Sequence, residues 1–140
     1  MKITGRVRLE TSDGQVVEGE NMVVNGGRDI FASLIADNTG TRPTHIALGT
    51  GTTPTTLTDI TLENEQGRNA IASTSSSSAV VTWKAFYGKS DLNGNTISNA
   101  GLFNASSGVT MLAAFVLAST IAKTSSISIT ITWTLTLADT

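Results

Sequence analysis

The chain of 140 residues contains no cysteine. Neither a disulfide nor a metal bound by thiolates can therefore hold it together, which fits a protein that matures in a reducing cytosol. A chain of this length suits one domain, because roughly two thirds of its unfolded surface can be buried around a single core. We expect one domain over residues 1–140 whose stability comes from packing.

Charged side chains are also scarce. The chain has nine Lys and Arg, eleven Asp and Glu, and a formal net charge of −2, so charged residues make up 14% of it. Roughly 25% is usual for a domain surrounded by water. Two interpretations stay open: a threonine-rich, solvated sheet surface, or a surface partly covered by partners in an assembly.

Three kinds of partner or destination find no support in the sequence. No cluster of Lys and Arg interleaved with aromatic residues offers a surface for phosphates, so nucleic acid is not an expected partner. The longest apolar runs, such as residues 111–118, fall short of the ~20 residues of a membrane-spanning helix. The first five residues contain no signal-peptide core. We expect neither a membrane partner nor export by a signal peptide.

What the chain does have is a long alternating pattern near its C-terminal end. Large apolar residues at positions 127, 129, 131, 133, 135 and 137 alternate with Ser128 and four threonines. Successive side chains of a strand point to opposite faces, and threonine suits a pleated surface. Residues 126–137 are therefore predicted to form a strand with one buried face, which places Trp133 in the core.

Further strands are predicted upstream. Residues 79–87 carry apolar side chains on both sides, which is typical of a strand covered on both faces. A hairpin turn is expected at Asn93-Gly94, followed by extended segments at 96–103 and 109–119. This spacing is typical of a sandwich or a barrel. Of the two we expect a mainly β protein, an antiparallel β-sandwich resembling a jelly roll, with its body at 44–137.

The N-terminal part of the chain combines a hairpin with a helix. Residues 1–24 are predicted to form a β-hairpin arm that either completes the main sheet or reaches toward a neighbour. Apolar residues at helical spacing predict a short helix over 26–38. Residues 49–61 are predicted to be a loop rich in threonine, and the serine run 74–78 a mobile turn.

Three motifs could suggest catalysis or ligand binding, but each is better explained by a structural role. The single histidine, His45, excludes any site with several histidines, and we expect it to be packed or at the surface. Gly49-Thr50-Gly51 lacks the third glycine of a phosphate loop, so the glycines are expected to let the backbone turn sharply. Residues 91–95 supply oxygen ligands as a calcium loop would, but Leu102 stands where the closing glutamate belongs.

The densest charged group lies at Glu63, Glu65 and Arg68. Two carboxylates this close could act as acid and base. Since no second polar cluster lies nearby in the sequence, we interpret Glu65 and Arg68 as a pair that pins a loop. The sequence predicts no catalytic residue, no metal site and no cofactor.

Two segments of the chain share a resemblance. The first runs from Thr44 to Gly51 and continues with Pro54, Leu62-Glu63-Asn64-Glu65 and Arg68. It resembles a signature of small virion proteins of tailed phages and of the N-terminal domains of phage tail-collar fibre proteins. The second, residues 97–108 followed by Met111-Leu112-Ala113, resembles the Gly-Leu-Phe turn of the same proteins, in the same order and spacing.

The resemblance covers residues 44–137, and the leading segment 20–27 also resembles that of stand-alone members. In the family a glutamate commonly precedes the Gly-Leu-Phe step, whereas this chain has Asn99 and Ala100 there, so a carboxylate contact does not carry over. The residues expected to serve structure or interaction are Gly49, Gly51, Pro54, Glu65, Arg68, Gly101, Leu102, Phe103 and Trp133.

The resemblance implies a structural component of a tailed-phage virion, made in the cytoplasm of the bacterial host. The first hypothesis is a capsid decoration or cement protein that forms a trimer, binds the major capsid protein at the outer head surface and stabilises the lattice without catalysis. The alternative is a collar, baseplate or fibre-adaptor subunit bound to tail or baseplate proteins. A third hypothesis, a glycan-binding or glycan-cleaving receptor module, would use Trp83, Tyr87 and Trp133 as a stacking platform.

Overall fold

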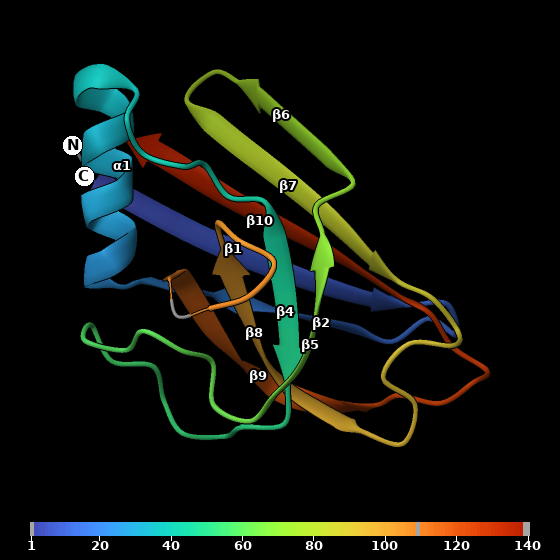
Figure 1. Cartoon of the computed structure of the whole chain (residues 1–140). Coiled ribbons are helices and arrows are strands. Elements are labelled where there is room, and N and C mark those ends of the chain that lie inside the picture. The colour runs from blue at the N-terminus through green and yellow to red at the C-terminus, as the bar shows by residue number, and fades with distance from the viewer. Residues whose placement is uncertain (1, 109, 139–140) are drawn as a thin grey trace.

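A computed structural model describes residues 2–108 and 110–138, in which two antiparallel sheets pack face to face beside one helix (Figure 1). Sheet A contains β1 (Lys2–Thr11), β2 (Val16–Glu20), β6 (Ser73–Ser77), β7 (Val80–Tyr87) and β10 (Ile129–Ala138), in the order β2-β1-β10-β7-β6. Sheet B contains β3 (Met22–Val23), β4 (His45–Gly49), β5 (Glu65–Ala70), β8 (Thr96–Phe103) and β9 (Met111–Ala122), in the order β3-β9-β8-β4-β5. The predicted mainly β sandwich with one short helix is confirmed.

The alternating C-terminal segment forms β10, the central strand of sheet A. It pairs with β1 from Lys2↔Ala138 to Thr11↔Ile129 and with β7 on its other side. Ile129, Ile131 and Trp133 are fully buried, as the alternation predicts, while the threonine row points to the outer face. The observed strand begins at Ile129, three residues later than predicted.

The N-terminal hairpin is part of sheet A in this chain. Strands β1 and β2 pair with each other, and β1 continues the sheet beyond β10. Val7, Leu9 and Val17 from this hairpin are buried in the main core between the sheets. The sequence left two roles open for this hairpin. In the structure it completes sheet A.

Strand β7 is covered on one face only, so the prediction of two covered faces was wrong. Trp83, Ala85 and Tyr87 are buried, whereas Lys84 and Phe86 point outward, and Phe86 is 54% exposed. The reason is that sheet B covers only the inner face of sheet A, and nothing in the described chain covers the outer face at this strand. Apolar content alone did not distinguish these two situations.

The serine run is a strand, which corrects the prediction of a mobile turn. Strand β6 pairs with β7 from Ser73↔Lys84 to Ser77↔Val80. The two residues between the strands, Ser78 and Ala79, both have positive φ (51° and 67°), as a type I′ hairpin requires. Serine has little intrinsic preference for strands, so the pairing partner decides the structure here.

The Asn-Gly signal marks a turn, but the predicted hairpin there was wrong. Strands β7 and β8 lie in different sheets, so residues 88–95 cross from sheet A to sheet B. Gly94 has a φ of +86°, a conformation that suits glycine. A turn signal fixes the local backbone, and the sheet that each flanking strand joins depends on contacts far away in the sequence.

The single helix of the described chain, α1 (Asn25–Asp37), begins one residue before the predicted range. Its first turn lies directly against β9: the Val24 N–H donates to the Leu112 carbonyl (3.1 Å). A Cβ on Gly27 would overlap that same carbonyl, so this glycine permits the close approach. The helix ends at Asn38 in the left-handed conformation. No helix in the described part of the chain is long and apolar enough to cross a membrane.

The sandwich has two apolar clusters, one on each side of sheet B. The main core lies between the sheets. The smaller one lies on the outer face of sheet B, beneath the loop that joins β4 to β5, and consists of Val24, Ala47, Leu62, Phe103, Met111 and Ala114. Strand β8 is therefore buried on both faces, and most of the residues that the sequence singled out lie in this strand, in the covering loop or in the two strands that the loop joins.

Candidate functional site

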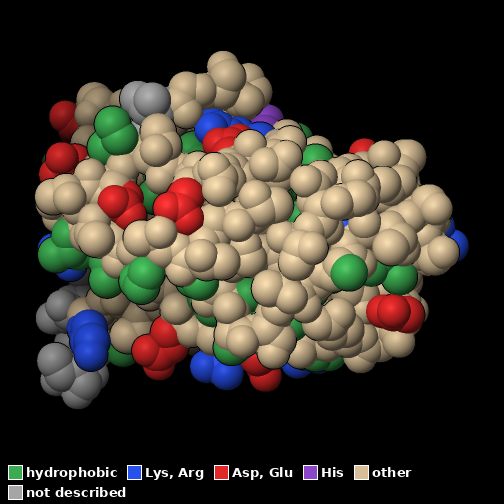
Figure 2. All heavy atoms as spheres, turned by 90° about the horizontal axis from the view of Figure 1, so that it is seen from below, with side chains coloured by type: hydrophobic (Ala, Val, Ile, Leu, Met, Phe, Trp, Pro, Cys, Tyr) green, Lys and Arg blue, Asp and Glu red, His purple; other side chains and the backbone are tan. Residues whose placement is uncertain are grey.

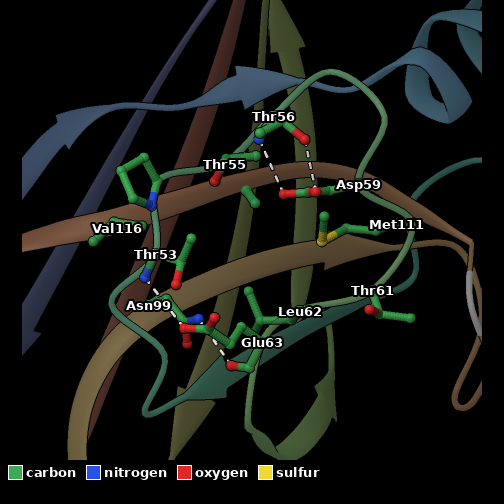
Figure 3. A pocket seen from close by; sticks show the side chains of 12 residues that line it. Thr53, Thr55, Thr56, Asp59, Thr61, Leu62, Glu63, Asn99, Met111 and Val116 are labelled. Carbon is green, nitrogen blue, oxygen red and sulfur yellow. Dashed lines mark hydrogen bonds between the residues drawn. The ribbon is translucent and has the colours of Figure 1, made fainter.

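The loop between β4 and β5, residues 50–64, forms one wall of a pocket on the outer face of sheet B (Figure 3). The pocket has a volume of about 310 Å³. Its polar wall comes from the threonine-rich loop and its apolar floor from β9. The lining residues are Thr53, Pro54, Thr55, Thr56, Asp59, Thr61, Leu62, Glu63, Asn99, Met111, Ala114 and Val116.

Glu63 holds the start of this loop. Its Oε1 accepts hydrogen bonds from the backbone N–H groups of Thr52 (2.9 Å) and Thr53 (3.1 Å), as Figure 3 shows in part. Hydrogen bonding by Thr53, through its side chain and its backbone, is the main reason that the pKa of Glu63 lies below its ordinary value. The carboxylate is thus engaged in fixing the backbone of the loop.

Gly49 and Gly51 leave room for Asn99 and Glu63. A Cβ on Gly49 would overlap Asn99 Oδ1, and one on Gly51 would lie 2.6 Å from both Asn99 Nδ2 and Glu63 Oε1. Neither glycine has a positive φ, so the backbone conformation does not require glycine at either position. Both are needed for close approach between side chain and backbone.

Asn99 is the centre of this contact. It is 3% exposed, and its Nδ2 donates to the Glu63 carbonyl (3.0 Å), which ties β8 to the end of the loop. Its Oδ1 is buried without a hydrogen-bond partner among the described residues. In the sequence, Asn99 stands out only as a departure from the pattern of the phage proteins that the chain resembles. A polar residue within an otherwise apolar strand was the signal available.

The middle of the loop is closed into a turn by Asp59. Its carboxylate accepts hydrogen bonds from Thr56, through the backbone N–H (3.0 Å) and the hydroxyl (2.7 Å). Pro54 lines the pocket between this turn and the Glu63 contacts. Both acidic side chains of the pocket therefore serve the loop's own conformation.

Arg68 is the centre of a second set of contacts, at the edge of sheet B. Its side chain is 7% exposed and makes a bidentate pair with Glu65, through Nε (2.9 Å) and one terminal nitrogen (2.8 Å). It also donates to the carbonyls of Ala105 and Gly108, both at 3.1 Å. The predicted pair of Glu65 and Arg68 is present, and the loop that it pins follows β8.

The Gly-Leu-Phe step brings the ring of Phe103 under this guanidinium. Arg68 Cζ lies 3.5 Å from the Phe103 ring centroid. Leu102 points into the main core, whereas Phe103 belongs to the outer cluster. A Cβ on Gly101 would lie 2.8 Å from the Phe103 ring, so the glycine lets the ring fold back along its own strand.

The three aromatic residues proposed as a glycan platform are all in the core. Trp83 is 4% exposed, Tyr87 1% and Trp133 0%. The Tyr87 hydroxyl donates to the Ile46 carbonyl (2.7 Å) and so links sheet A to sheet B. Burial raises the pKa of this hydroxyl. None of the three rings is available to stack on a sugar.

No family model, curated protein or solved structure matches this chain.

The chemistry that the described side chains can perform is limited by the hydrogen bonds that they already make. His45 is half-buried, with Nδ1 2.8 Å from the Thr44 hydroxyl. Lys123, which no sequence pattern singles out, is 1% exposed and donates to Asn93 Oδ1 (2.8 Å) and the Thr124 carbonyl (3.1 Å). Its burial lowers its pKa. Within residues 2–108 and 110–138, no group of three or more His, Cys, Asp or Glu side chains is placed to hold a metal ion.

Proposed function

We propose that this chain is a structural component of a tailed-phage virion, and that it decorates the outer surface of the head. The observation that carries the proposal is the way the two signature segments fit each other. Gly49 and Gly51 make room for Asn99 and Glu63, and Arg68 packs on Phe103 while it holds the loop after β8. A signature built from such contacts maintains a scaffold.

The same contacts favour action by binding over catalysis. Glu63 and Glu65 are the carboxylates that could have formed an acid and base pair, and each is committed to neighbours that fix the backbone. General acid–base work needs a group that is free to exchange a proton with a substrate. We therefore propose a protein without catalytic residues or a cofactor.

The surface supports a role in an assembly. Figure 2 shows one face of the molecule, on which acidic and basic side chains are scattered among uncharged ones and gather into no patch of one sign. Such a surface gives little electrostatic attraction to nucleic acid. Such a surface suits repeated contacts, in which each copy of a small subunit adds a modest free energy of binding. The partners that we propose are other copies of this chain and the major capsid protein.

The alternative location is the tail, as a collar, baseplate or fibre-adaptor subunit. The resemblance to tail-collar fibre proteins supports it, because the signature is shared. The glycan-receptor hypothesis loses its main support, since the aromatic rings on which it relied are buried.

The test is binding of the purified chain to expanded capsids that lack it. We expect saturable binding with a fixed number of copies per capsid, together with gold labelling of heads in intact particles. Labelling confined to tails would replace the head location with the alternative. Turnover of a polysaccharide that Glu65→Ala abolishes would overturn the proposal of a non-catalytic protein.

A further inference from the structure

Strand β6 ends sheet A with an edge that carries no charge. Its five residues, Ser73 to Ser77, pair with β7 on one side only, and all five are exposed (Figure 1). The flanking residues 71–79 contain no charged side chain and no proline. An edge strand presents a row of unpaired N–H and C=O groups, and charges or proline are the usual protection against pairing with another chain.

The other three sheet edges are each protected by a recognisable device. Strand β2 carries Glu18, which lies 3.9 Å from Arg6 and 3.8 Å from Arg8, and β3 has only two residues. Strand β5 carries two charged side chains, Glu65 and Arg68, which form an ion pair. Among the described strands, β6 alone is a full-length edge without such a device.

The absence of charge points to a second copy of the chain as the partner. When two identical edges meet, every charge on one is brought near the same charge on the other, and like charges directly opposite each other are destabilising. The edge of β6 avoids this cost, whereas two copies of β2 would bring their glutamates together.

We infer that two copies of this chain join through their β6 strands, antiparallel and related by a two-fold axis. The longest register pairs Ser73 of one copy with Ser77 of the other and places Ser75 opposite Ser75. Sheet A then continues across both copies. A contact of this kind uses the same surface on both sides and closes after two subunits.

The strength of the contact is limited by its size. A pair of five-residue strands buries less than the roughly 1,200–2,000 Å² of a stable interface. Next to the edge, Thr74 borders an apolar groove of about 250 Å³ lined in part by Val81, Trp83 and Leu135, which adds apolar surface to the contact. We expect an association that depends on protein concentration and that gains strength when many copies are held on one particle.

This inference rests on the proposed assembly role, but the two can fail separately. Particle labelling tests where the chain lies, whereas sedimentation of the purified chain tests the β6 contact.

Sedimentation equilibrium provides the first test. The wild-type chain should shift from monomer to dimer as its concentration rises, and Ser75→Lys should weaken the dimer at least tenfold because it places two lysines opposite each other. The matched control is Ser125→Lys, which makes the same change of charge in an exposed turn away from β6 and should leave the dimer unchanged. A wild-type chain that stays monomeric, or a dimer insensitive to Ser75→Lys, overturns the inference.

Cross-linking provides the second test and reports the register. Since the chain has no cysteine, Ser75→Cys introduces the only thiol. Mild oxidation at dimer-forming concentrations should convert most of this variant to a disulfide-linked dimer, whereas Ser125→Cys should form few. Equal cross-linking of both variants would contradict the proposed contact. So would a trimer without the Ser75 cross-link, or a β6 edge that binds only other particle proteins.

Discussion

At the scale of single residues, Asn99 is where the glycine segment, the covering loop and the centre of sheet B meet. Its amide bonds the Glu63 carbonyl, and Gly49 and Gly51 approach it so closely that a methyl group would not fit. Interiors are packed densely, so an added atom forces neighbours to move. The conformation of the loop and the packing of sheet B therefore depend on each other at Gly49, Gly51 and Asn99.

Gly51→Ala tests this dependence. The added Cβ would lie 2.6 Å from Asn99 Nδ2 and 2.7 Å from Glu63 Cβ. We expect the free energy of unfolding, measured in urea, to fall by about 1–3 kcal/mol. Gly88→Ala is the control, because its Cβ would meet neighbours only at 3.6 Å or more, and it should change stability little. Equal losses for both variants would contradict the account of Gly51.

Arg68→Met removes the guanidinium but keeps an apolar side chain over Phe103. The change leaves Glu65 and the carbonyls of Ala105 and Gly108 without their donor. We expect a loss of about 2 kcal/mol in urea unfolding, since hydrogen bonds to charged groups contribute most when buried. Arg8→Met removes a 44% exposed ion-pair partner and should change stability much less, because surface ion pairs contribute little. Similar costs at both positions would show that burial of Arg68 does not matter.

Glu63 makes stability depend on pH in the acid range. Its pKa is lowered in the folded chain, so its contribution is fully present above its ordinary pKa of 4.5 and is lost as pH falls through the lower, folded value. Glu63→Gln should therefore be less stable than wild type at pH 7, and its stability should fall less between pH 5 and pH 3. Urea unfolding across this range measures both slopes, and parallel slopes would contradict the role of Glu63.

At the scale of elements, the sequence predicted the strands and the helix whose residue pattern alone determines their structure. The alternation from Ile127 to Leu137 has one solution, a strand with a buried face, and the helical spacing from Ile30 to Ile35 is equally clear. Strands β5 and β6 contain no large apolar residue and become strands by pairing with β4 and β7. No local signal identifies such strands, because their stabilising partners are distant in sequence.

In the candidate site, too, contacts between residues close in sequence were predictable and contacts between distant segments were not. Glu65 and Arg68 were predicted to pair because they belong to the densest charged group of the sequence and no second polar cluster lies nearby, and they do pair. The roles of Asn99 and of the two glycines could not be predicted, since they arise where segments about 50 residues apart in sequence meet. Trp133 was correctly assigned to the core from the register of its strand.

The N-terminal hairpin offers a test at this scale. Deleting residues 1–20 would remove the whole β1 partner of β10 and expose the core contacts of Val7 and Leu9. We expect the truncated chain to lose its folded circular dichroism signal and its cooperative unfolding. A truncated chain that folds but no longer associates would instead mean that the hairpin bridges neighbouring copies.

At the scale of the whole molecule, the sandwich combines a rigidly packed interior with an exterior suited to contacts. Its interior is fixed by the main core and by Tyr87, which crosses from sheet A to sheet B. Its exterior is weakly charged, with an uncharged five-residue edge at β6 and a threonine row along β10. Such a subunit is suited to repeated weak contacts, in which the particle supplies the multiplicity.

A cryo-electron microscopy map of the intact particle tests the central claim most directly. The account predicts density that fits this two-sheet sandwich at regular positions on the outer surface of the head, repeated with the symmetry of the capsid lattice. Density confined to the collar or baseplate would move the chain to the tail. Absence of the chain from the particle altogether would contradict the proposed structural role.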